Sequence, residues 1–214
     1  MRSLTYQTYL TGKADPDEEL PMIVSLHFMG SSPEQTFDIL LGSFGFPSRV
    51  IAPYGPYRHD DHYAWFPDSF YNEDEVGQGK FVDEMVEILL ENVESWRREF
   101  PTKGKPIFLG VSQGGDMCFT LAAKHADRFR LCLPIAGRLL IDELTKKDQA
   151  GLIRIHHGKE DPIVPIDGAR KAAKYLLSAN LDVEIREFEN AGHEVPEEMV
   201  FSIQDDIYAA IKDE

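Results

Sequence analysis

The chain has 214 residues, of which 43% are hydrophobic, and its formal net charge is −15. This length supports one well-packed core and is short for two, so we expect a single domain over residues 1–214. The acidic charge disfavours nucleic acid and anionic membrane surfaces as partners, because both are bound by basic patches. Scattered acidic side chains of this kind most often serve solubility.

The cysteines and the N-terminus bear on the compartment. Only Cys118 and Cys132 are present, which is no disulfide framework and favours a reducing environment. The first ten residues lack the apolar stretch of a signal peptide, and no apolar run approaches the length of a membrane span. The sequence therefore predicts a cytoplasmic protein without a membrane span, and it gives no oligomeric state.

Short apolar runs alternate with amphipathic stretches along the chain. The run 22–27 is typical of a strand buried on both faces of a parallel sheet, and Ser32 and Pro33 suit the start of a helix. The alternation predicts a mostly parallel sheet with helices on both faces. We expect strands over residues 4–10, 22–27, 49–53, 107–111, 131–137, 152–158 and 183–188, and helices over 33–44, 75–100, 115–123, 167–179 and 196–212.

The segment 54–71 is the most unusual part of the chain. It holds seven aromatic residues, and its Gly55, Pro56 and Pro67 predict irregular structure. Such a loop is either functional or an Ω-loop that its aromatic side chains pin to the body of the protein. The run His59-Asp60-Asp61-His62 offers metal-competent groups, but consecutive residues cannot all converge on one ion, so we expect polar loop residues and no metal site.

A serine framed by glycines follows the strand expected over residues 107–111. The pattern Gly110-x-Ser112-x-Gly114 fits a nucleophile elbow, a strained strand-to-helix turn that exposes the serine oxygen. Glycine two residues before and after the serine relieves the crowding of such a turn, because it has no Cβ. Alone, the pattern fits equally well a glycine-rich turn without chemistry.

Two further residues follow later strands. Asp161 comes after the run 152–158 and His193 after the run 183–188. Carboxyl ends of parallel strands meet at one edge of a sheet, so we expect these side chains to lie near Ser112. Serine needs a base to become a nucleophile, and that base needs an acid that holds its tautomer. Separately, Asp161 could shape a turn and His193 could be a surface residue, but the order Ser, Asp, His is that of α/β-hydrolases.

An oxyanion hole normally uses the N–H after the nucleophile and another from an early strand-to-helix loop. Gln113 supplies the first and lies at a helix N-terminus, where negative charge is favoured. The second comes from the loop after His27, either from Phe28 or from Met29.

Several motifs at the ends of the expected strands have a familiar form. They are residues 26–30 (LHFMG), 63–66 (YAWF), 110–115 (GVSQGG), 135–139 (IAGRL), 157–165 (HGKEDPIVP) and 192–193 (GH). Together they resemble the phospholipase/carboxylesterase group of α/β-hydrolases, which includes the acyl-protein thioesterases. The resemblance implies an α/β-hydrolase fold without a large cap domain.

The resemblance also implies an activity, which is hydrolysis of carboxylic esters or thioesters without a cofactor. It assigns Ser112 as nucleophile, Asp161 as acid and His193 as base, with the N–H of Met29 completing the oxyanion hole beside that of Gln113. The group usually has glycine where this chain has Phe28, so the phenyl ring is expected to narrow the acyl pocket or to displace the oxyanion loop.

The substrate is expected to be a small-molecule acyl ester or thioester in an apolar cleft. Two other functions stay open at this point: a lactone or dienelactone hydrolase, and a non-catalytic binding protein on the same scaffold. The residues expected to line the cleft are Phe28, Met29, Trp65, Phe66, Leu139 and Leu140, several of which could equally belong to the core.

Overall fold

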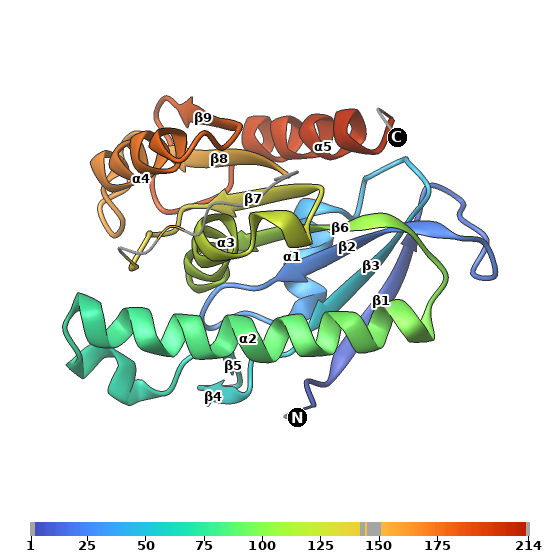
Figure 1. Ribbon diagram of the computed structural model, residues 1–214, viewed down its shortest axis with the longest axis horizontal. Helices are drawn as coiled ribbons and strands as arrows, with labels where there is room; N and C mark the ends of the chain where they lie inside the picture. Colours follow the sequence, from blue (N-terminus) through green and yellow to red (C-terminus); the bar gives the residue numbers. More distant parts are fainter. Residues whose placement is uncertain (1–2, 142–143, 145–150, 213–214) are drawn as a thin grey trace.

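The computed structural model describes residues 3–141, 144 and 151–212. The single domain expected over residues 1–214 extends beyond these ranges. Within the described part, seven strands form one sheet in the order β1-β3-β2-β6-β7-β8-β9 (Figure 1). All neighbours pair in parallel except β1, which runs antiparallel to β3 at the edge. The strands are β1 (Tyr6–Thr11), β2 (Leu20–Leu26), β3 (Ser48–Pro53), β6 (Thr102–Val111), β7 (Leu131–Ile135), β8 (Leu152–Gly158) and β9 (Val183–Phe188).

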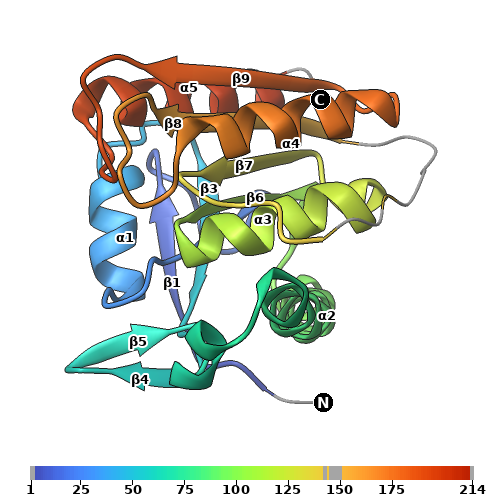
Figure 2. The same ribbon diagram turned by 90° about the vertical axis from the view of Figure 1, so that its left-hand side faces the viewer.

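Helices cover both faces of this sheet, as Figures 1 and 2 show. One face packs against α2, α3 and α4, and the other packs against α1 and α5. The fold is therefore the expected α/β-hydrolase arrangement. The helices are α1 (Pro33–Leu40), α2 (Glu75–Glu99), α3 (Gln113–Lys124), α4 (Ile166–Ser178) and α5 (Glu197–Lys212), with short 3₁₀ turns η1 (Asp68–Asn72) and η2 (Ala126–Arg128).

The central strands are mostly apolar where both of their faces are buried, as in β2 and in the second half of β6. Along β2, Met22 and Val24 belong to the core beneath α2 and α3, whereas Ile23 between them belongs to the core beneath α1 and α5. Successive side chains of a strand point to opposite faces, so a strand between two helical layers has no polar side.

The segment 54–71 differs from the expectation of irregular structure. It contains a short hairpin of β4 (Tyr57–His59) and β5 (His62–Ala64), followed by η1. The hairpin closes where Asp60 adopts a left-handed φ of 50°, a conformation that aspartate tolerates better than most residues. Three-residue strands are too short to display a period of two, which explains why the sequence pattern missed them.

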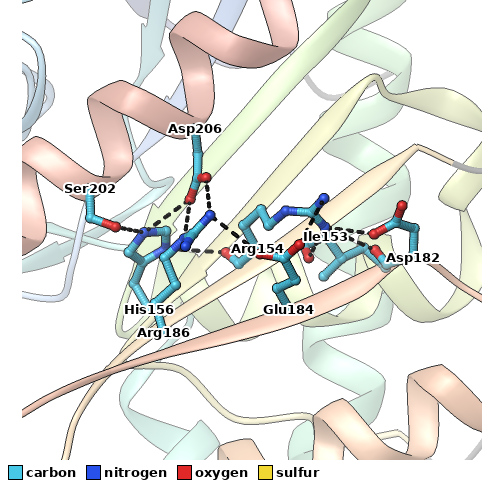
Figure 3. A network of polar contacts seen from close by, with 8 residues as sticks. All are labelled: Ile153, Arg154, His156, Asp182, Glu184, Arg186, Ser202 and Asp206. Carbon is cyan, nitrogen blue, oxygen red and sulfur yellow. Dashed lines mark hydrogen bonds and ion pairs between the residues drawn. The ribbon is translucent and has the colours of Figure 1, made fainter.

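Helix α5 is held on the sheet by a polar network, drawn in Figure 3. Arg186 on β9 donates to both carboxylate oxygens of Asp206, at 2.8 Å and 2.5 Å. The buried ring of His156 on β8 lies with its Nε2 3.1 Å from Ser202 Oγ and 3.3 Å from Asp206 Oδ2. One face of α5 thus binds two neighbouring strands through side chains.

None of the helices that the structure describes has both the length and the apolar character required to cross a membrane.

Candidate functional site

Ser112 lies in a strained turn between β6 and α3. Its φ and ψ are 53° and −111°, a region that residues with a side chain rarely occupy. A Cβ on Gly110 would lie 2.2 Å from the carbonyl oxygen of Gly114, and a Cβ on Gly114 would lie 2.5 Å from that of Leu26. The two glycines therefore permit the close approach of strand and helix that pushes the serine outward.

The side chains of Ser112, His193 and Asp161 form one hydrogen-bonded chain. Ser112 Oγ lies 3.0 Å from His193 Nε2, and His193 Nδ1 lies 2.7 Å from Asp161 Oδ2. Because a carboxylate can only accept, Nδ1 carries the ring proton and leaves Nε2 free to accept from the serine hydroxyl. The structure brings together three residues that are separated by as many as 81 positions.

The carboxylate of Asp161 is held rigidly in its own turn. Its Oδ1 accepts from the backbone N–H groups of Ile163 and Val164, each at 2.8 Å, so Oδ2 is left for His193. His157 Nε2 lies 2.7 Å from the Val164 carbonyl and 3.5 Å from Asp161 Oδ2, and burial lowers the pKa of His157. A neutral His157 therefore supports the aspartate turn, while neighbouring His156 points to the other face of the sheet.

His27 orients the loop expected to supply the second oxyanion donor. Its Nδ1 lies 2.8 Å from the Phe28 carbonyl, and its Nε2 accepts from the Gly55 N–H at 2.9 Å. The Phe28 carbonyl also accepts from the Ser31 N–H at 3.2 Å. In a trans peptide the N–H points opposite to the carbonyl, so these bonds set the direction of the Met29 N–H.

The donor pattern of His27 requires a neutral ring with its proton on Nδ1. Burial lowers the pKa of His27 to about 4, which keeps the ring neutral at pH 7. Phe28 is not among the residues of the described chain with left-handed φ. The backbone at this position thus needs no glycine, and the Phe28 side chain packs against the core beneath α1 and α5.

Side chains around Gln113 connect both expected oxyanion donors. Its Oε1 accepts from the Trp65 N–H at 2.9 Å, and its Nε2 donates to the Tyr71 hydroxyl at 2.8 Å. That hydroxyl lies 3.0 Å from Met29 Sδ, while the Trp65 indole donates to the His27 carbonyl at 2.8 Å. Within the described residues, neither the Met29 N–H nor the Gln113 N–H has an acceptor.

Ser112 and His193 open onto a pocket of about 740 Å³. Of the six residues expected to line the cleft, Phe28 and Met29 line this pocket. The other four are not among its lining residues, and this corrects that part of the expectation. Trp65 and Phe66 are buried in the core, because the Trp65 ring stacks on His27 at 5.0 Å and Phe66 stacks on Phe70 at 4.5 Å. The remaining two, Leu139 and Leu140, are half-buried against the core beneath α2.

The run 59–62 forms the turn of the β4–β5 hairpin, with His59 opposite His62. Across the described ranges, no group of three or more His, Cys, Asp and Glu side chains is arranged to hold a metal ion.

The model of the phospholipase/carboxylesterase family matches residues 12–211. The chain belongs to this family. The membership indicates a hydrolase of the carboxylesterase type. A comparison with proteins of curated function finds no match.

Solved structures agree on the fold of this family member. Esterase PE8 has a TM-score of 0.83 at 18% identity, with 98% of this chain and 100% of that chain covered. A carboxylesterase from Mesorhizobium loti has a TM-score of 0.80 at 17% identity, with 96% and 94% covered. The Bacillus cereus carboxylesterase has a TM-score of 0.68 at 16% identity, with 96% and 94% covered.

Three charged residues that line the pocket, Asp116, Arg138 and Glu194, were absent from the sequence-based expectations for this family member. Asp116 is 2% exposed, and it receives the backbone N–H of Arg138 on Oδ1 at 2.7 Å and its guanidinium on Oδ2 at 2.8 Å. Burial raises the pKa of Asp116, against the opposing effect of the guanidinium. The available signal was a carboxylate four residues after Ser112, directly before the mostly apolar run 117–123.

Proposed function

We propose that the protein is a serine hydrolase that cleaves carboxylic esters through an acyl-enzyme on Ser112. The observation that carries this proposal is the hydrogen-bonded chain from Ser112 through His193 to Asp161, opening onto a largely apolar pocket. Family membership supports the reaction class, and the residue roles are our inference.

In the proposed first half-reaction, Ser112 Oγ attacks the acyl carbonyl while His193 Nε2 takes its proton. Asp161 stabilises the imidazolium through its 2.7 Å contact with Nδ1. The negative charge that forms on the carbonyl oxygen would be received by the N–H groups of Gln113 and Met29. His193 then gives its proton to the leaving alcohol or thiol, and the acyl group stays on the serine.

In the second half-reaction, water replaces the alcohol. His193 takes a proton from the water, which attacks the acyl carbonyl, and then returns the proton to Ser112 Oγ as the acid product leaves. Thioesters and lactones follow the same route with a thiol or a tethered alcohol as leaving group. A lactone panel beside open esters and thioesters separates these substrate classes.

Replacement of Ser112 by alanine tests the proposal. We expect Ser112→Ala to lower hydrolysis of p-nitrophenyl butyrate by at least about 10⁴-fold, because removal of the nucleophile ends acyl transfer. A fluorophosphonate probe should modify the wild-type serine and leave the variant unlabelled. Thermal unfolding should show that both proteins are folded.

Ser178→Ala is the matched control, because Ser178 is exposed at the end of α4 and its hydroxyl contacts only the Tyr175 carbonyl within the described chain. This variant should be labelled and should hydrolyse ester like the wild type. A folded wild-type protein that neither reacts with the probe nor hydrolyses any acyl ester contradicts the proposal and favours a binding protein on this scaffold.

A further inference from the structure

One wall of the pocket presents a guanidinium that a buried carboxylate holds in place. Arg138 and Asp116 both line the pocket. Arg138 lies on the loop that follows β7, whereas Asp116 lies in α3. This loop is specially shaped: Ala136 has a left-handed φ of 47°, and a Cβ on Gly137 would lie 2.5 Å from the Gly115 carbonyl carbon. A locally strained loop and a buried carboxylate thus place Arg138 beside α3.

The ion pair exposes its positive partner and conceals its negative one. The Arg138 side chain is 36% exposed, whereas that of Asp116 is 3% exposed and has both oxygens directed at Arg138. The guanidinium donates to Asp116 Oδ2 and to Gln78 Oε1. Of its five N–H groups, three therefore have no acceptor among the residues described. Because Arg138 lines the pocket, a ligand bound there can reach its guanidinium.

The apolar lining of the pocket favours the binding of an anion to Arg138. Much of its lining is apolar, and an anion loses little there to competing water when it meets a fixed fork of donors. The other acidic side chain in the lining is Glu194, which is exposed and follows His193.

The buried partner of Arg138 lies close to Ser112 along α3. The Asp116 N–H donates to the Ser112 carbonyl at 2.8 Å, so Asp116 lies one helical turn, about 5.4 Å of rise, along α3 from the serine. Because Arg138, Ser112 and His193 line one pocket, a group bound by Arg138 can belong to the same substrate that Ser112 would attack.

We propose that Arg138 receives a free carboxylate of the substrate, so that the preferred esters are anionic. The carboxylate belongs either to the acyl part, as in a half-ester of a short dicarboxylic acid, or to the leaving group. This inference rests on the proposed esterase function and narrows its substrate class. A guanidinium fork suits a carboxylate because it donates two parallel hydrogen bonds.

Matched ester pairs test the preference in the wild-type protein. The acyl pair is mono-4-nitrophenyl glutarate against methyl 4-nitrophenyl glutarate, and the leaving-group pair is 4-butyryloxybenzoate against its methyl ester. In at least one of the two pairs, kcat/KM for the anionic ester should exceed that for the neutral ester by about 10-fold to 100-fold, which is the usual effect of a hydrogen bond to a charged group. A ratio of one or less in both pairs overturns the proposal.

Variants assign the preference to the residue. Arg138→Gln should bring the anionic-to-neutral ratio to about one, and the double change of Arg138→Gln with Asp116→Asn should do the same without leaving a buried carboxylate unpaired. Arg128→Gln is the matched control, since it removes the same charge from a surface ion pair with Glu94. If Arg128→Gln lowers the ratio as much as Arg138→Gln, the preference comes from overall charge and the proposal is wrong.

Failure of the proposed function gives a different result. If no ester is hydrolysed and the fluorophosphonate does not react, the subsite is tested by calorimetric binding instead. Monomethyl glutarate should then bind the wild type more tightly than dimethyl glutarate, and Arg138→Gln should remove the difference. Equal binding of the two compounds overturns the carboxylate subsite.

Discussion

His27 holds the Phe28–Met29 peptide in position, although no atom of its side chain takes part in the proposed reaction. Its two ring nitrogens join the Phe28 carbonyl to the Gly55 N–H, and Trp65 stacks on the ring. Because the Phe28 carbonyl and the Met29 N–H belong to one peptide, rotation of that peptide would turn the N–H away. His27 is therefore a positioning residue for the proposed oxyanion hole.

We expect His27→Ala to lower kcat by about 10-fold to 100-fold with a smaller effect on KM, because the donor is needed most in the transition state. His27→Asn is the informative comparison, since its amide nitrogen can replace Nδ1 as donor to the Phe28 carbonyl. Ester kinetics on both variants, with thermal unfolding as a check of folding, measure the effect. Equal kcat in the two variants would mean that His27 acts only through packing.

At the scale of elements, the elbow depends on contact between backbones. Strand β6, the first turn of α3 and the end of β2 meet where Gly110, Gly114 and the Leu26 carbonyl lie. No side-chain movement relieves a clash between a Cβ and a carbonyl oxygen. The position of Ser112 is thus a property of three packed elements.

Gly114→Ala should destabilise the protein by about 2 kcal/mol or more and lower esterase activity sharply, because its new Cβ meets the backbone of β2. Gly168→Ala is the control, since nothing lies within 4 Å of a Cβ at that exposed position of α4. There the same change should stabilise by about 0.5–1 kcal/mol. Denaturant unfolding of both variants measures the contrast, and similar losses in both would refute the close-approach explanation.

The network beneath α5 makes a pH-dependent contribution. Burial acts to raise the pKa of Asp206, but hydrogen bonds from His156 and Arg186 outweigh it and lower the pKa. A carboxyl group whose pKa is lower in the folded state adds stability above its unfolded pKa, near 3.9, and loses that stability as pH falls below this value.

Asp206→Asn should therefore cost on the order of 2 kcal/mol at pH 7, a figure reduced because the Arg186 side chain is 37% exposed. The difference in melting temperature from wild type should shrink as the pH falls from 6 to 3. Asp182→Asn, which alters the more exposed partner of Arg154 in Figure 3, should cost less than about 0.5 kcal/mol. A difference that stays constant with pH would contradict this account.

At the scale of the whole molecule, charge is the dominant feature. The chain has 37 acidic and 22 basic residues, and this imbalance of like charge opposes the compact state. We expect the melting temperature to rise as sodium chloride increases from 10 to 200 mM, because screening weakens that repulsion. A melting temperature that falls with added salt would show instead that surface ion pairs outweigh the net charge.

The expected site residues differ in how far sequence could place them. Ser112 could be predicted as a candidate because the crowding of its turn is local and its glycines lie two residues away. Asp161 and His193 could be predicted as candidates because each follows a strand of a parallel sheet. In contrast, Trp65 was assigned to the cleft although it lies in the core, since its position depends on Gln113 and His27.

By itself, the sequence determined the alternation of strands and helices, the strained serine turn and the order of the candidate residues, because these depend on neighbours within a few positions. Only the tertiary structure decided which way the Phe28–Met29 peptide faces and which charges enter the pocket. His27 binds Gly55, 28 positions away, and Arg138 binds Asp116, 22 positions away. Such contacts form between elements that packing brings together, so no local pattern of residue types contains them.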